Sequence, residues 1–153
     1  MTTRLPALIL LLLMASRAHA GLGDSVASID VDTARLGQAR RVVIASATAS
    51  VRTHVITLRD GSVIKEFVGS DNRVFAVTWN TRLKPRLEDL LGQYAPTFSA
   101  ASAQAARSPG IRHSLAVNEG DLVVQTTAHL DAHAGIAYLR SQVPADVRID
   151  DLR

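Results

Sequence analysis

Two strand-like runs flank the dipeptide Asp60-Gly61, and this arrangement constrains the fold more than any other part of the chain. The runs cover residues 51–58 and 63–68. Asp-Gly is a strong hairpin signal, because a type I′ turn requires positive φ angles. The pattern therefore predicts a β-hairpin centred on Asp60-Gly61.

A third strand-like run, residues 73–79, follows a second predicted turn at residues 69–72. Alternation along this run places Phe75, Val77 and Trp79 on one face. Three successive strands with such short connections predict an antiparallel meander.

A helix is predicted directly after the meander. Pro85 can open it, Tyr94 lies at its end, and Pro96 is expected to stop it. Its apolar residues recur with the i, i+3, i+4, i+7 spacing of one helix face: Leu87, Leu90, Leu91 and Tyr94. We expect Trp79 to be buried between this helix and the meander, because exposed aromatic stripes are uncommon in monomers.

The remaining chain adds shorter elements. Asp24 can cap a helix over residues 25–36, and residues 99–110 form an alanine-rich segment, expected to be a partly helical surface segment or a mobile linker. Further strands are predicted at 42–44, 115–117, 122–130 and 136–139. The expected fold class is α+β: an antiparallel β-meander packed against one or two helices, in a single domain over residues 21–153.

Residues 1–20 have the pattern of a signal peptide. Arg4 precedes a short apolar run, and Ala18-His19-Ala20 is the small-x-small pattern that signal peptidase cleaves. The run is too short to cross a membrane as a helix, which needs about 20 apolar residues. We therefore expect cleavage between Ala20 and Gly21 and a periplasmic or secreted mature protein without a transmembrane segment.

Composition excludes several classes of function. The chain contains no cysteine, which excludes disulfides, thiolate metal sites and a cysteine nucleophile. Loss of Arg4 and Arg17 with the signal takes the 17 basic side chains to 15, against 14 acidic ones. A nearly balanced mature chain offers no electrostatic argument for binding nucleic acid.

Several stretches together resemble a known family. They are the run from Asp60 to Val68, the run from Val74 to Trp79, the segment Pro85–Tyr94, and later Leu122-Val123-Val124-Gln125, His129 and Gly135–Leu139. The chain resembles the domain of unknown function 2844, a family of small exported proteobacterial proteins. The resemblance implies a single exported domain, and it implies no activity, because the family has none assigned.

The best metal-ligand candidates are His129, Asp131 and His133. In a continuous strand these three side chains would share one face, and in a helix the two histidines would lie one turn apart. Either geometry could offer imidazole and carboxylate ligands to zinc. The alternative is that they are solvated polar residues beside the end of a strand, since a site needs three or four ligands and further donors are not evident. No metal is therefore expected.

Other catalytic signatures are missing. The sequence contains no Gly-x-Ser-x-Gly elbow, no Gly-x-Gly-x-x-Gly loop and no Walker loop, so no cofactor and no catalytic residue are predicted. The leading interpretation is a non-enzymatic exported protein that binds an unknown envelope or periplasmic partner or supports the envelope. Two alternatives stay open: a small metal-dependent hydrolase using His129, Asp131 and His133, and an inhibitor of another exported protein that acts through a sheet edge.

Overall fold

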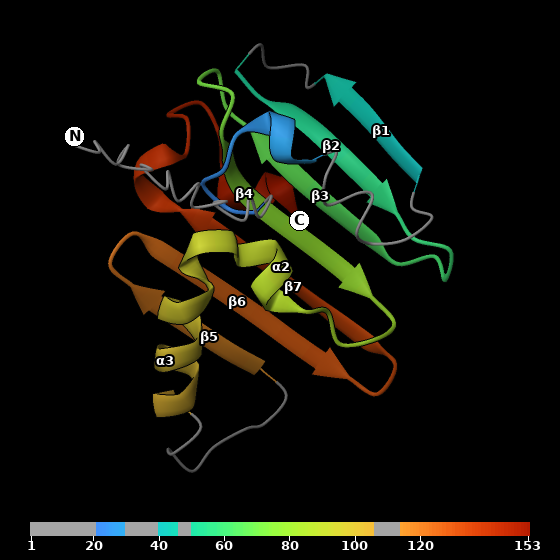
Figure 1. Cartoon of the computed structure of the whole chain (residues 1–153), viewed down its shortest axis with the longest axis vertical. Helices are drawn as coiled ribbons and strands as arrows, with labels where there is room; N and C mark the ends of the chain where they lie inside the picture. The colour runs from blue at the N-terminus through green and yellow to red at the C-terminus, as the bar shows by residue number, and fades with distance from the viewer. Residues whose placement is uncertain (1–20, 30–39, 46–49, 106–113) are drawn as a thin grey trace, which may run out of the picture.

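The computed structural model describes residues 21–29, 40–45, 50–105 and 114–153, which form a mainly β domain (Figure 1). Its centre is an antiparallel sheet of seven strands. The strands are β1 (Arg40–Ala45), β2 (Arg52–Thr57), β3 (Val63–Val68), β4 (Val74–Thr81), β5 (Ser114–Glu119), β6 (Leu122–His129) and β7 (Ala132–Leu139). Each strand predicted from the sequence is present, with β7 beginning earlier than expected.

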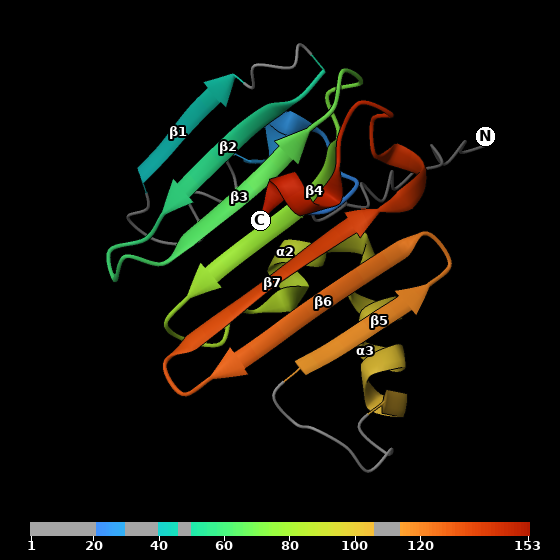
Figure 2. The ribbon, with the colours of Figure 1, turned by 180° about the vertical axis from the view of Figure 1, so that it is seen from behind.

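The strand order is β1-β2-β3-β4-β7-β6-β5, so the sheet consists of two meanders. The first meander runs from β1 to β4, and the second runs from β5 back to β7, which pairs with β4. A helical stretch between β4 and β5 carries the chain across one face of the sheet to its far edge (Figures 1 and 2). We call this the helix face and the opposite side the open face.

The β2–β3 hairpin forms where it was predicted, but its turn is of another type. Gly61 has a φ of 83°, whereas Asp60 has no positive φ, so this is not a type I′ turn. The Gly61 N–H donates to the Leu58 carbonyl at 3.1 Å, and the Leu58 N–H donates to the Ser62 carbonyl at 2.8 Å. A three-residue loop that ends in a left-handed glycine produces this pattern.

The predicted common face of Phe75, Val77 and Trp79 is wrong for Phe75. Phe67 pairs with Ala76 and Val68 pairs with Val74, so Phe75 is an extra, unpaired residue of a β-bulge. The bulge turns Phe75 to the open face, where its ring centroid lies 6.4 Å from that of Phe67. Val77 and Trp79 remain on the helix face.

The helical stretch consists of α2 (Leu87–Leu91), the 3₁₀ helix η2 (Gly92–Tyr94) and α3 (Ala95–Ala105). The expectation that Pro96 ends the helix is wrong, because Pro96 is the second residue of α3, where proline lacks no necessary hydrogen bond. The predicted stripe holds: Leu90 and Leu91 are buried in the sheet's core cluster, and Leu87 and Tyr94 are half-buried against it. No helix among the described residues is long and apolar enough to cross a membrane.

Two further segments complete the fold. At the N-terminal side, the Leu22 N–H donates to the Leu90 carbonyl, and the 3₁₀ helix η1 (Val26–Ser28) follows. The predicted helix over residues 25–36 lies largely outside the described residues, as do residues 106–110 of the alanine-rich segment. At the other end, 3₁₀ helices η3 (Arg140–Gln142) and η4 (Ile149–Leu152) belong to a segment that covers part of the open face (Figure 2).

Trp79 is buried, with 3% of its surface exposed, as the sequence predicts. It lies directly opposite Gly135 across the β4–β7 pair. A Cβ atom added to Gly135 would lie 2.2 Å from Trp79 Cζ2 and 2.6 Å from the Gln125 carbonyl oxygen. Only glycine therefore leaves room for the indole at this point of the sheet.

The Asp60 carboxylate gives the hairpin a pH dependence. Its pKa lies below the ordinary value of 3.8, first because it accepts a hydrogen bond from the Ser62 N–H and second because it accepts one from the Ser62 hydroxyl. A lowered folded-state pKa adds stability above the unfolded pKa, and this contribution is lost as the pH falls through the folded pKa.

We expect Asp60→Ala to lower the melting temperature at neutral pH and to have a shrinking effect below about pH 4. Asp131→Ala, in the exposed β6–β7 turn, serves as the control, and an equal effect of Asp60→Ala at all pH values would contradict the assignment.

Gly135→Ala should lower the free energy of unfolding by about 1–3 kcal/mol, the usual cost of overpacking. Neither neighbour can yield easily, because one is a packed indole and the other is backbone. Urea titration measures the loss, and a red shift of the Trp79 emission should accompany it. As a control, Ala134→Ser changes the preceding residue of β7, which faces the open side, and should leave the free energy of unfolding nearly unchanged. Wild-type stability and emission in Gly135→Ala would show that this contact is not made.

Candidate functional site

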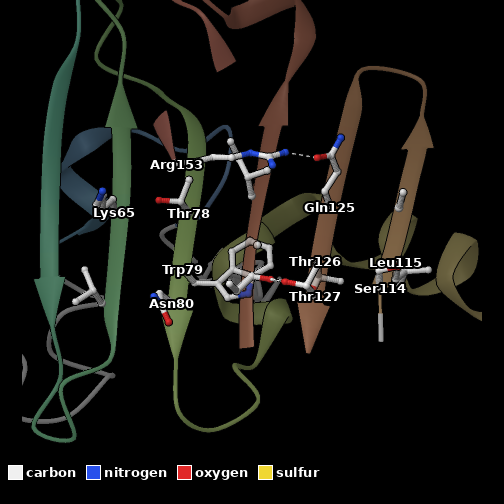
Figure 3. A pocket seen from close by; sticks show the side chains of 15 residues that line it. Lys65, Thr78, Trp79, Asn80, Ser114, Leu115, Gln125, Thr126, Thr127 and Arg153 are labelled. Carbon is white, nitrogen blue, oxygen red and sulfur yellow. Dashed lines mark hydrogen bonds between the residues drawn. The ribbon is translucent and has the colours of Figure 1, made fainter. Parts of the chain in front are cut away.

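The C-terminal segment covers only part of the open face and leaves a groove of about 640 Å³ beside it (Figure 3). Residues from five neighbouring strands line the groove, together with Arg153 at the end of the covering segment. Three consecutive residues contribute from each of β4, β5, β6 and β7, so side chains that face the groove alternate with residues that present backbone.

The strand register arranges the side chains of the groove in two rows across the sheet. Neighbouring strands lie about 4.8 Å apart, so each row extends over roughly 19 Å. The first row is Lys65, Thr78, Ile136, Gln125 and Ala116. The second row is Val63, Asn80, Ala134, Thr127 and Ser114.

The polar groups of the groove are hydroxyls, amides and two cations. Uncharged polar side chains come from three strands, β4, β5 and β6: Thr78, Asn80, Ser114, Gln125 and Thr127. Lys65 and Arg153 carry the positive charges, and neither a carboxylate nor an imidazole is among the side chains that line the groove. The groove can therefore offer hydrogen bonds and positive charge, and it holds no carboxylate or imidazole side chain that could act as a general base.

Arg153 reaches across the groove from the covering segment. Its guanidinium donates a hydrogen bond to Gln125 Oε1, two strands away from Thr78 (Figure 3). Among the described residues, neither Lys65 nor Arg153 lies within ion-pairing distance of an Asp or Glu side chain. Both positive charges are thus available to a ligand.

The structure does not bring His129, Asp131 and His133 together. The expected shared face required one continuous strand, but β6 ends at His129 and β7 begins at Ala132, with a turn between them. The register then places His129 on the open face, opposite Ala132, and His133 on the helix face, opposite Ala128 and Thr81. The described residues contain no group of three or more His, Cys, Asp or Glu side chains that could hold a metal.

A buried polar pair was missed by the sequence reasoning. His54 and Glu66 lie directly opposite each other in β2 and β3 and are 2% and 1% exposed. They lie on the helix face, next to the cross-strand pair of Ile56 and Ile64 in the same two strands. The sequence carried a signal for this, because Lys65-Glu66 within an apolar strand must place one charge on each face.

The groove was also missed, because its residues belong to five strands and to the C-terminal turn. None of its residues is among the site candidates predicted from the sequence, which were His129, Asp131 and His133. The polar residues of the groove match no spacing that predicts a site.

Comparison with known proteins gives one result. A family profile matches residues 18–152, and the family is described as Protein of unknown function (DUF2844). No curated protein and no solved structure matches the chain.

Proposed function

Since the chain belongs to the DUF2844 family, whose description assigns no activity, we propose from its structure that it is an exported, non-enzymatic binding protein. Its ligand occupies the groove on the open face. The groove supports this proposal by its size, because small-molecule sites commonly enclose about 300–1,000 Å³. Most of the exposed surface of its lining is apolar, with polar groups placed among it, as is usual for such sites.

The side chains of the groove favour binding over catalysis. Hydroxyl nucleophiles need a neighbouring base, which in acid–base catalysis is most often an imidazole or a carboxylate. The hydroxyls of Thr78, Ser114 and Thr127 have neither group beside them in the groove. The alternative hydrolase built on His129, Asp131 and His133 receives no support from the geometry, since the two histidines face opposite sides of the sheet.

Export is proposed from the signal pattern of residues 1–20, with cleavage between Ala20 and Gly21. The protein would act in the periplasm or outside the cell, with a ligand or partner from the envelope.

A second candidate function rests on the edge strand β1. Val42, Val43 and Ile44 are 44%, 51% and 52% exposed, an unusual run of apolar residues for a sheet edge. An inhibitor that adds its edge to a strand of another exported protein would use such a surface. The other edge strand, β5, presents mostly polar residues and is the weaker candidate.

Protein recovered from the periplasm of an expressing bacterium should begin at Gly21. Intact-mass spectrometry measures this directly. Ala18→Leu together with Ala20→Leu removes the small residues that the peptidase requires and should leave residues 1–20 attached. A wild-type protein that retains residues 1–20, or that stays inside the cell, would contradict export.

A library of small fragments should bind in the groove. Titrations followed by ¹H–¹⁵N NMR should shift the amides of Thr78, Asn80, Gln125 and Thr127 before others. Ala134→Phe fills the second row and should weaken binding by about tenfold or more, because a bulky ring occupies the ligand's space. Ala132→Phe makes the same change on the same face beyond the groove and should have no effect.

Each outcome of this titration decides between the candidates. Fragments or peptides that shift β1 amides instead would replace the groove by the edge-strand function. No shifts in any part of the sheet would overturn the binding proposal for both surfaces.

A further inference from the structure

We propose that the groove selects an amphiphilic anion: a carboxylate or phosphate group attached to an uncharged, largely apolar body. The anionic group lies over Thr78, between Lys65 and Arg153, and the body continues along both rows toward β5. This inference rests on the proposed function and adds the chemical class of the ligand.

The position of the anionic group follows from the register of the first row. Lys65 is directly opposite Thr78, on the side of the sheet that faces the groove (Figure 3). On the other side of Thr78, the Arg153 guanidinium donates a hydrogen bond to Gln125. Gln125 pairs with Ile136, and Ile136 pairs with Thr78 in the next strand. An anion over Thr78 would therefore have a cation on each side and a hydroxyl donor beneath it.

No acidic side chain lines the groove beside these cations. The nearest acidic residues in sequence are Asp150 and Asp151, on the same turn as Arg153, and both are exposed and outside the groove lining. The side chains that line the groove thus carry positive charge only, although residues 21–153 together hold 15 basic and 14 acidic side chains. Two cationic side chains in a concave site without acidic side chains favour an anion over a neutral ligand or a cation.

The body of the ligand is inferred from the rest of the lining. From β7 toward β5 the apolar side chains of the floor are Ile136, Ala134 and Ala116, and Val63 lies at the opposite end of the second row, in β3. No aromatic ring faces the groove from its ten row positions, since the Trp79 side chain lies on the helix face. A flexible apolar body suits this floor better than a flat ring that needs a stacking partner.

Three probes separate the parts of the proposal: octanoate, octanamide and acetate. Octanoate and octanamide share the apolar body and differ in charge, whereas acetate has the charge without the body. We expect octanoate to bind with groove amide shifts, octanamide to bind about tenfold more weakly, and acetate to bind weakest. Octyl phosphate should bind like octanoate, and inorganic phosphate like acetate. Raising the ionic strength should weaken octanoate but leave octanamide unchanged.

Matched variants then locate the anionic group. Lys65→Met keeps the aliphatic stem and removes the charge, and it should weaken octanoate about tenfold without changing octanamide. Lys84→Met, an exposed lysine outside the groove, is the control. Arg153→Gln should act like Lys65→Met, with the exposed Arg148→Gln as its control. An unchanged Trp79 emission and melting temperature show that each variant is folded.

The results distinguish failure of this inference from failure of the proposed function. Equal binding of octanoate and octanamide, both with groove shifts, would leave the binding function standing and overturn the anion. Equal binding of acetate and octanoate would overturn the apolar body. Unchanged octanoate affinity in both Lys65→Met and Arg153→Gln would overturn the position of the anionic group. Absence of groove shifts with every probe and every fragment would overturn the binding function itself.

Discussion

The contact of Trp79 with Gly135 joins the two halves of the sheet, and much of the rest of the fold is arranged around it. The indole spreads over a strand that has no side chain at this point, so β4 and β7 pair closely beneath it. This pair is the junction between the two meanders. The same indole belongs to the cluster that contains Leu90 and Leu91 of α2, so sheet and helix share one core. Burial of a tryptophan supplies a large apolar contribution to a single small domain.

The two faces of the sheet differ in how completely they are covered. On the helix face the helical stretch and the N-terminal residues around Leu22 and Ile29 bury the apolar side chains. On the open face the bulge at Phe75 turns one aromatic ring toward Phe67 and Leu152, and this smaller cluster holds the C-terminal segment. That segment ends beside the groove, so the element that covers one half of the face also supplies Arg153 to the other half. Core packing and the candidate site are therefore built by the same segment.

The groove also explains why some residues of the open face, which have no evident role in stability, are polar. Thr78 and Ile136 are buried in the sheet, but Asn80, Gln125 and Ser114 are exposed and could be polar residues of any kind without harm to the core. Their common feature is their place in two rows that meet two cations. Ligand binding by such a surface needs no reactive group, which agrees with a chain without catalytic signatures.

The sequence by itself determined the local structure: the strands, the hairpin at Asp60-Gly61, the apolar stripe of the helix and the burial of Trp79. Strand alternation, turn chemistry and helical periodicity act over a few residues, so they can be read from the chain directly. Only the tertiary structure decided the pairing of β7 with β4, the bulge that moves Phe75, the turn that separates His129 from His133, and the groove. Strand order and face coverage depend on contacts between residues far apart in the chain. The groove brings together Lys65, Gln125 and Arg153, which are far apart in the chain. Their spacing in the sequence therefore does not predict the groove.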